Sequence, residues 1–501
     1  MAELKRPILS LTGLIKPEED ALFELATYDV LLPCRRFDVD HKVALVGRVS
    51  LTAEFLLRLL KSADGIDEGE AATFFGFDLR DMSFVLSEVE ALGYVERREG
   101  RLWLSFAGMS LFQAGSDQPQ IFEVEARREN VGFDLISLAP EPPRGLDEFD
   151  RRLPELALLQ PEVASRAASQ LPAAFRRFYP EIMSRRDRAV GDRRSLYSID
   201  AVSPGDRFSS PVRIVVRSSG LRPWVGAPDL VEWRTEPEQE ERPEVLDAAS
   251  AFVDGLTVNQ RSDDAEAYGS LLELAPEFLK EFVRRDGLAV DKYYREAFTR
   301  AGEVRSDRQT IPLVGSILGR QNLRKVTEVL AYGLRSATRP SVVLWLAPMV
   351  RCWGATRMLP ELLRQLKAQL RTDPGGEPNV RMASVALITG RPEAHLEKAF
   401  DHVATSDVPR FPRALEILLI PRVMVAVAVH APVGSRDGLP VPLGFISFDP
   451  RVIGRAGDYI ASRSGPFLRD RQMESLVVGE LQEGLDEDAI RDVGITRPDE
   501  P

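Results

Sequence analysis

Short, almost uninterrupted apolar runs in the C-terminal part of the chain constrain its fold more than any other feature. Residues 415–420, 423–429 and 441–448 are rich in aliphatic and β-branched side chains, which is typical of strands buried on both faces. Upstream, residues 341–348 and 381–388 predict two further strands. Helices are predicted between these runs, one over 392–403 and one with a leucine stripe at Leu359, Leu362, Leu363, Leu366 and Leu370.

Composition bounds the rest of the chain. The 501 residues are 44% hydrophobic and 28% charged, which is ordinary for a globular protein with several domains. No apolar run approaches the roughly eighteen residues of a membrane span. The two cysteines and four histidines are too scattered for a disulfide framework or a metal cluster, although His395 and His402 fall on one predicted helix. We therefore expect a cytoplasmic protein without membrane contact, cofactor or metal.

The pattern predicts a multidomain α+β and α/β protein. We expect N-terminal strands and a helical module in residues 1–118, a mixed α+β middle region in 119–240, a helical connector in 241–319, an α/β domain in 320–481 and an acidic tail in 482–501.

A His–Asp–Gly pattern lies among the last predicted strands. Asp437 follows His430 by seven residues, and Gly444 follows Asp437 by seven. This spacing resembles the phospholipase D signature, HxKxxxxD followed by GSxxN. The order of the surrounding segments (strand, helix, strand, helix, then paired strands) is also similar to one phospholipase D-like half-domain. The segment after residue 458 is similar to the end of the sensor domains of TrmB-type regulators.

Three positions depart from the family pattern. Pro432 stands where the family has Lys, and Phe445 and Phe448 stand where it has Ser and Asn. In the family the His attacks phosphorus and the other three groups hold the phosphoryl oxygens. Losing one such donor typically costs about 2.7–4 kcal/mol of transition-state stabilisation. The resemblance therefore implies an inactive copy, a pseudoenzyme with no confident catalytic residue. The alternative is an active phosphodiesterase or nuclease that uses His430.

Three predicted helices and a hairpin lie near the N-terminus. The helices span residues 51–63, 67–75 and 78–92, and Glu99-Gly100 is a two-residue hairpin turn. With the segment EALGYVERREGRLWLSFAG, this order resembles a winged helix. In DNA-binding members the third helix enters the major groove. Here that helix carries four carboxylates, so DNA contact and protein contact both remain open.

Arginines are the candidates for nucleic-acid contact, although the net charge of −12 argues against broad binding to phosphates. The candidates are Arg97, Arg98 and Arg101 in the hairpin and Arg176, Arg177, Arg185 and Arg186 in the middle region. The preference for arginine over lysine also fits a GC-rich genome.

The single copy of the motif bears on assembly. Phospholipase D-like sites resemble paired half-sites, so one copy predicts pairing with a second copy or with a similar partner. Phe445 and Phe448 are the candidate partner-binding residues, unless they fill the core of their own domain. We expect a non-catalytic regulatory or scaffold protein of a bacterial nucleic-acid-directed system, either phage defence or transcription control. A second alternative is a stand-alone DNA-binding transcription regulator.

Overall fold

The structure is a computed structural model of the whole chain. It describes residues 7–13, 15, 20–46, 50–113, 118–119, 122–186, 194–299, 303–335, 339–371, 382–468 and 474–481. The predicted acidic tail, 482–501, lies outside these residues. Among the described residues, no helix has both the length and the apolarity that crossing a bilayer requires.

The chain forms two compact units, and neither is continuous in sequence. Unit 1 comprises residues 1–33, 143–161 and 209–501, and unit 2 comprises 34–142 and 162–208. The boundaries therefore differ from the predicted ones. The segment 241–319, predicted as a helical connector, belongs to unit 1 and also contains a strand of its main sheet.

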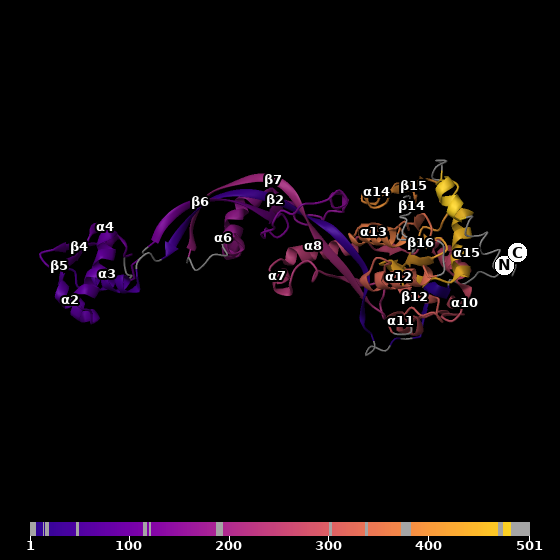
Figure 1. Cartoon of the computed structure of the whole chain (residues 1–501), viewed down its shortest axis with the longest axis horizontal. Helices are drawn as coiled ribbons and strands as arrows, with labels where there is room; N and C mark the ends of the chain where they lie inside the picture. Colours follow the sequence, from indigo (N-terminus) through magenta and orange to yellow (C-terminus); the bar gives the residue numbers. More distant parts are fainter. Residues whose placement is uncertain are drawn as a thin grey trace, which may run out of the picture. The chain divides into compact units, whose positions relative to one another are not determined.

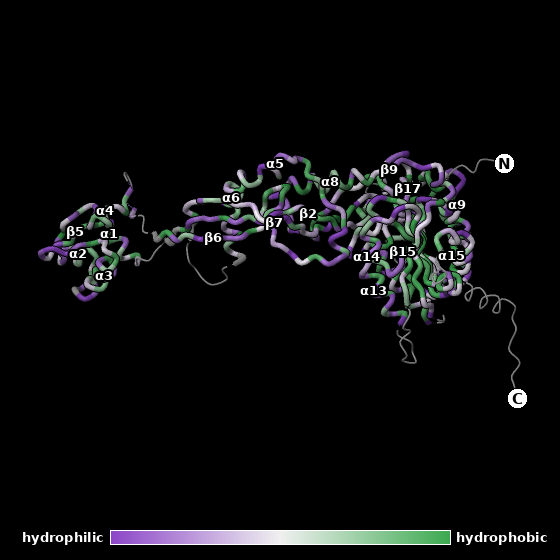
Figure 2. Tube along the Cα trace, turned by 90° about the horizontal axis from the view of Figure 1, so that it is seen from above, coloured by the Kyte–Doolittle hydropathy of each residue, from purple (hydrophilic) through white to green (hydrophobic). Residues whose placement is uncertain are grey.

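Unit 1 is built on a seven-stranded mixed sheet with the order β12-β19-β17-β16-β13-β14-β15 (Figure 1). The strands are β12 (Thr310–Val314), β13 (Val342–Leu346), β14 (Ala383–Thr389), β15 (His402–Ser406), β16 (Leu415–Ile420), β17 (Met424–Ala431) and β19 (Val441–Ser447). The central strands are buried on both faces, and Figure 2 shows them as a hydrophobic layer. This burial explains their continuous apolar runs.

Helices cover both faces of this sheet. On one face lie α12 (Arg320–Gly333), α13 (Met358–Arg371) and α14 (Leu396–Ala399), which share a core with the strands. On the other face, α9 (Asp264–Leu274) and α15 (Pro450–Ala461) contact β17. Unit 1 also contains α7 (Glu236–Glu240), α8 (Pro243–Asp254), α10 (Pro276–Leu279) and α11 (Val290–Phe298).

Most predicted strands of this sheet are confirmed, and one predicted helix is wrong over much of its length. The structure has strands within all five predicted runs. The predicted helix over 392–403 shrinks to the four residues of α14, and β15 begins at His402. His395 and His402 therefore do not share a helix. The short β15 pairs in parallel with β14, and this long-range pairing outweighs the local helical pattern.

Two long strands run through boundaries between the units. These are β2 (Leu22–Val46) and β7 (Arg194–Ser219), which join β6 (Phe122–Asp134) and β8 (Gly226–Asp229) in a sheet of order β6-β2-β7-β8. β6 pairs with β2 in antiparallel register along its whole length. In unit 2, His41 of β2 is buried against Phe175 and Tyr179 of α6 (Ala167–Arg186).

Residues 50–112 of unit 2 form a small body that we call the helix–hairpin module. Its elements are α1 (Leu51–Ser62), β3 (Ile66–Asp67), α2 (Glu68–Phe75), α3 (Leu79–Ala91), β4 (Val95–Arg98), β5 (Arg101–Leu104) and α4 (Phe106–Ser110). The three predicted helices and the hairpin are thus confirmed. Glu99 and Gly100 both have positive φ, as a two-residue type I′ turn requires.

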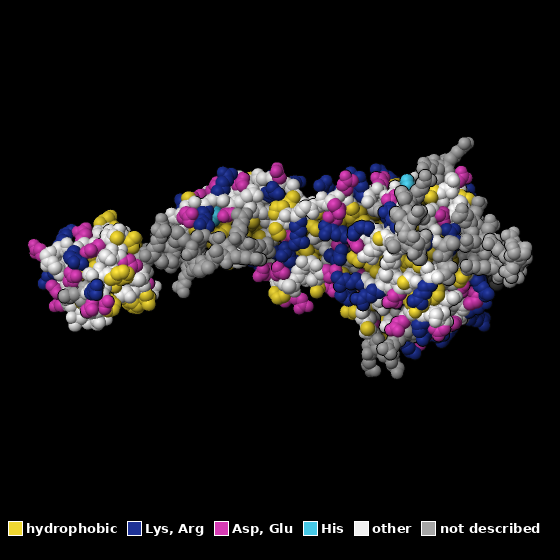
Figure 3. Space-filling view, viewed as in Figure 1, with side chains coloured by type: hydrophobic (Ala, Val, Ile, Leu, Met, Phe, Trp, Pro, Cys, Tyr) yellow, Lys and Arg dark blue, Asp and Glu magenta, His cyan; other side chains and the backbone are white. Residues whose placement is uncertain are grey.

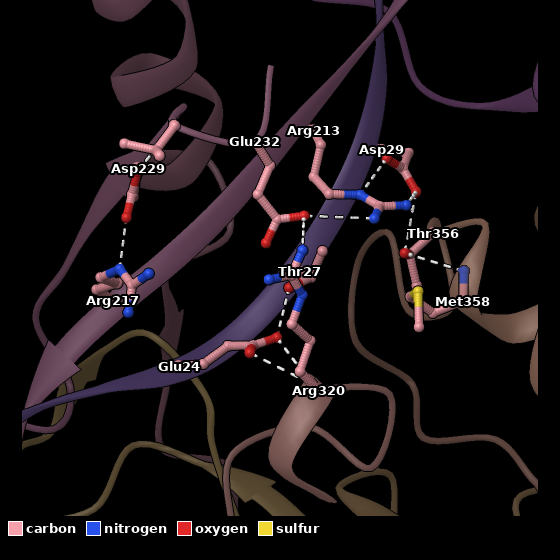
Figure 4. Close-up of polar contacts among 11 residues, drawn as sticks. Glu24, Thr27, Asp29, Arg213, Arg217, Asp229, Glu232, Arg320, Thr356 and Met358 are labelled. Carbon is pink, nitrogen blue, oxygen red and sulfur yellow. Dashed lines mark hydrogen bonds and ion pairs between the residues drawn. The ribbon is translucent and has the colours of Figure 1, made fainter. Parts of the chain in front are cut away.

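A buried carboxylate, that of Asp29 on β2, joins distant segments of unit 1 (Figure 4). Its oxygens accept two hydrogen bonds from the Arg213 guanidinium on β7, at 2.9 and 3.0 Å. They also accept from Thr356 Oγ1 at 3.0 Å and from the backbone N–H of Arg357 at 2.7 Å. One carboxylate therefore holds β2, β7 and the start of α13 together.

We expect Asp29→Asn to destabilise unit 1 strongly, because it removes the buried charge that accepts two hydrogen bonds from Arg213 and leaves this guanidinium only its longer contact with Glu232, at 3.4 Å. Removing one member of a buried pair typically costs about 3–5 kcal/mol. Asp229→Asn is the matched control, since Asp229 faces the more exposed Arg217 in the same region (Figure 4). That change should cost less than about 1 kcal/mol. Denaturant unfolding followed by tryptophan fluorescence measures both, and equal stability losses in the two variants would contradict the prediction.

A second buried charge lies on the buried face of α12. Lys325 is buried, and its Nζ donates to the carbonyl oxygens of Ala297 at 2.7 Å and Pro312 at 3.2 Å. Among the described residues, no carboxylate lies within ion-pair distance of this amine. Burial lowers the pKa of Lys325 to about 8, although Glu328 opposes the shift.

This lysine should make stability rise with pH. The unfolded chain holds the proton up to a pKa of about 10.4, whereas the folded chain releases it near pH 8. The penalty for burying the charge is therefore fully present below pH 8 and is lost between about pH 8 and pH 10. Over this range the wild type should gain roughly 3 kcal/mol relative to Lys325→Met. If the unfolding free energies of the wild type and Lys325→Met changed with pH in parallel, the lowered pKa of Lys325 would be contradicted.

Candidate functional site

One edge of the seven-stranded sheet gathers the candidate groups. The parallel strands β13, β14 and β15 end at this edge, and the antiparallel pairing places the end of β17 and the start of β19 there too. In open α/β sheets, ligands bind at the carboxyl ends of the strands. The loop between β17 and β19, residues 432–440, lies at this edge and carries much of the sequence motif. We call it the motif loop.

His430 is sealed inside the sheet domain. Its side chain is 5% exposed, and its Nε2 lies 2.5 Å from a carboxylate oxygen of Glu416 on β16. The other oxygen of that carboxylate accepts from the indole N–H groups of Trp345 at 3.0 Å and Trp353 at 3.2 Å. All four side chains are buried, so His430 belongs to a satisfied internal polar cluster.

The two phenylalanines of the motif fill the chain's own core, which corrects their assignment as partner-binding residues. Phe445 is fully buried, and its ring contacts that of Phe278 at 6.1 Å between centroids. Phe448 stacks on Tyr332 of α12 at 5.4 Å and packs against the sheet core. The Phe445 ring is therefore not available to a second protein, whereas Phe448 is only partly buried. Both side chains contribute to packing within unit 1.

The other motif positions also have structural roles. A Cβ at Gly444 would lie 1.9 Å from the Val427 carbonyl oxygen, so no larger residue fits between these strands. Pro432 is buried, and Asp437 is exposed in a two-residue strand pair with Asn259. His430, Asp437 and Gly444 therefore share the spacing of a catalytic motif but form no catalytic cluster.

The motif loop is held in place from outside the sheet. The side-chain amide of Gln260 donates to the carbonyl oxygen of Ser435 at 2.7 Å, and its backbone N–H donates to that of Arg436 at 2.8 Å. Gly434 has φ +84°, and a Cβ there would lie 2.7 Å from the Trp224 ring. Trp224 and Gln260 thus hold the loop in one position.

A cavity of about 810 Å³ opens beside the outer side of the motif loop. Its polar lining comes from four separate segments and includes Ser10, Gln260, Arg285, Asp286, Ser435 and Arg436. Arg285 and Arg436 are both exposed. Within the described ranges, neither guanidinium has a carboxylate at ion-pair distance. The cavity therefore offers two guanidinium groups that are outside any described ion pair, together with one carboxylate, Asp286.

A second cavity, of about 500 Å³, lies where β14 and β15 end. Two arginines line this cavity, Arg410 and Arg413. Arg413 donates hydrogen bonds to Asp263 from both Nε and Nη2. Those bonds hold the pKa of Asp263 at about 2, against the effect of partial burial. Glu266 and Asp407 also line this cavity. Its charge is largely neutralised, so the cavity beside the motif loop is the stronger anion site.

The arginines predicted to contact nucleic acid do not form one site. Arg97 pairs with Glu68 at 3.4 Å and Glu90 at 3.3 Å, and Arg98 pairs with Glu96. Arg101 donates to the Gly65 carbonyl oxygen at 3.0 Å. The hairpin therefore presents little uncompensated positive charge.

The middle arginines lie on a different element, α6. Arg176 and Arg177 are on its exposed face, and Arg177 lies over the Phe178 ring. The side chains of Arg185 and Arg186 lie outside the described residues. No described contact joins Arg176 or Arg177 to the hairpin.

The residues of the cavity were missed by sequence reasoning. Arg285 and Arg436 lie about 150 residues apart; Arg285 belongs to no recognisable motif, and Arg436 lies between the motif's His430 and Asp437 but at none of its matched positions. In the part of the chain that the structure describes, His, Cys, Asp and Glu side chains form no group of three or more that could hold a metal. No protein-family model, curated protein or solved structure matches this chain.

We expect Glu416→Leu to destabilise the protein by about 3–5 kcal/mol, because it leaves two indole N–H groups and an imidazole without their acceptor. Glu397→Ala, on the exposed side of α14, is the control and should change stability by less than about 0.5 kcal/mol. The emission of Trp345 and Trp353 should shift only in the Glu416 variant. A Glu416→Leu protein as stable as the wild type would show that the cluster is dispensable.

Proposed function

We propose that the chain is a non-catalytic regulatory or scaffold protein whose C-terminal domain binds a small anionic ligand in the cavity beside the motif loop. One observation carries this proposal: His430 is buried against Glu416, whereas the outer side of the same loop lines a cavity with two arginines outside any described ion pair. The motif loop thus faces a charged cavity, and the charged residue that it contributes to the lining is Arg436 and not His430.

The strand order supports a phospholipase D-like origin for this domain. After β12 and α12, the chain runs through β13, α13, β14, α14 and β15, and then through the paired strands β16, β17 and β19 around the motif. This is close to the order that the resemblance implies. The helix–hairpin module similarly has the helix and hairpin order of a winged helix.

Hydrolysis is disfavoured by the surroundings of His430. A nucleophile must reach the phosphorus atom, and fixed donors must meet the charge that develops on the phosphoryl oxygens. His430 is 5% exposed, and the positions of the expected donors hold Pro432, Phe445 and Phe448. The active phosphodiesterase is therefore the weaker alternative.

The chemistry of the cavity favours a phosphate or carboxylate ligand. Guanidinium groups bind these anions through paired, charge-assisted hydrogen bonds. Ser10, Ser435 and Gln260 add uncharged polar groups to the same lining. The net charge of −12 and the nearby Asp286 disfavour a long polyanion, so a small ligand fits better.

The context we propose is a nucleic-acid-directed system, phage defence or transcription control. This rests on the combination of a winged-helix-like module with a phospholipase D-like domain. The acidic α3 and the paired arginines of the hairpin favour protein contact over DNA contact for the module. A stand-alone DNA-binding regulator is therefore disfavoured.

Anion binding is tested by calorimetry on the full-length protein, with inorganic phosphate, pyrophosphate and a nucleoside diphosphate as probes. We expect at least one probe to bind. Arg285→Ala and Arg436→Ala should each weaken its binding by about tenfold to a hundredfold, because each removes a hydrogen bond to a charged group. Arg410→Ala is the control: it removes the same charge from the smaller cavity and should leave affinity unchanged.

The same preparations should not hydrolyse a generic phosphodiester or DNA, with or without divalent metal. Turnover that disappears in His430→Ala would establish the active enzyme instead. Anion binding that all three arginine variants retain equally would place the ligand elsewhere.

A further inference from the structure

The helix–hairpin module exposes an unusual number of large apolar side chains. Eight of the seventeen such side chains that are exposed among the described residues lie between positions 51 and 109. The most exposed large apolar side chains of α1, α3 and α4 are Leu51 at 70%, Phe84 at 76% and Phe106 at 88%. Figure 3 shows hydrophobic side chains gathered over part of this module. Contiguous patches of this kind mark interaction sites.

These side chains are not an unfilled core. The module buries a core of its own, to which α3 contributes Met82, Val85, Leu86 and Val89. Phe84 lies on the opposite face of α3, and Leu92, the C-cap residue of this helix, is also exposed. The module can therefore fold without them, and their exposure needs another explanation.

The exposed residues of α1 and α3 lie side by side. Phe84, Glu88 and Leu92 follow each other at intervals of four and so share one face of α3. The Glu88 carboxylate accepts a hydrogen bond from Ser50 Oγ at 2.7 Å, and Ser50 caps α1. This bond brings the first turn of α1, with Leu51 and then Phe55, next to that face.

The same surface continues onto α4. Ser105, the cap of α4, donates from Oγ to the Gly93 carbonyl oxygen at 2.6 Å, and its backbone N–H donates to Tyr94 at 3.0 Å. Phe106 therefore begins its helix beside the end of α3. We call the resulting surface the apolar strip: Leu51, Phe55, Phe84, Leu92, Phe106 and Met109.

Charge decides what kind of partner this surface fits. Residues 50–112 hold eleven carboxylates and six basic side chains, and Arg97 and Arg98 are already paired. Glu54, Asp81 and Glu88 lie on the same helical faces as the strip. A nucleic acid would be repelled by this excess, and a second copy would bring like charges together. A basic partner complements it.

We propose that the apolar strip is the docking surface for an amphipathic helix of a partner protein, with apolar residues on one face and basic residues at its flanks. Such helices lay their apolar face along a hydrophobic surface through side chains at intervals of three and four. The exposed residues of α1 and α3 recur at the same intervals. This inference deepens the protein-contact part of the proposed function and does not depend on the anion cavity.

Fluorescence anisotropy with full-length protein tests the docking surface. The probe is a labelled helical peptide of leucine and lysine with one apolar face, and the comparison peptides are a scrambled version and a leucine–glutamate version. We expect the amphipathic basic peptide to bind best. Phe84→Ser and Leu51→Ser should each weaken it by about tenfold or more, as for central interface residues. Phe74→Ser, an equally exposed change on α2, should have no effect.

Four outcomes would overturn the proposal. Equal binding of the leucine–glutamate peptide would show that basic charge is not recognised. Equal binding of the scrambled peptide would show that an amphipathic helix is not recognised. Concentration-dependent dimerisation, detected by light scattering and lost in Phe84→Ser, would make the strip a self-association surface. Binding of duplex DNA that is lost in Phe84→Ser would make it a nucleic-acid surface. Arg285→Ala and Arg436→Ala serve as independent controls, because they should weaken anion binding and leave peptide binding intact.

Discussion

The buried carboxylate of Asp29 is the interaction on which unit 1 depends most. It accepts hydrogen bonds from Arg213, Thr356 and Arg357, which are separated from it by about two hundred residues or more. A buried charge is tolerated only when its lone pairs are satisfied, so these segments must come together for the domain to form. The start of β2 and the end of β7 are therefore structural parts of unit 1, together with the C-terminal sheet.

The same principle separates structural charges from candidate functional charges. Glu416 is buried and satisfied by His430, Trp345 and Trp353, and this gives the histidine of the motif a structural role. Arg285 and Arg436 are exposed beside a cavity, and no described carboxylate lies at ion-pair distance from either. Satisfied groups stabilise the fold, whereas groups that face a cavity without a partner are available to a ligand.

Local patterns predicted much of the fold but little of the site. β16, β17 and β19 were predicted because burial on both faces produces continuous apolar runs. β12 was missed because five residues containing Pro312 carry a weak signal, and it forms by pairing with β19 more than a hundred residues later. The role of Glu416 was equally hidden, since one carboxylate in an apolar run does not reveal its partners. The cavity arginines meet only through tertiary structure.

The two proposed surfaces have opposite chemistry and belong to different units. The basic cavity belongs to unit 1, and the acidic module with its apolar strip belongs to unit 2. A ligand in the cavity can alter docking at the strip only if it binds two states of the chain with different affinity. Two of the four chain crossings lie within β2 and β7, which Asp29 and Arg213 join just inside unit 1. Any coupling carried by these strands must therefore act on the segments that this buried ion pair holds. Where the pair stays intact, we expect a ligand in the cavity of unit 1 to leave docking at the apolar strip of unit 2 unchanged.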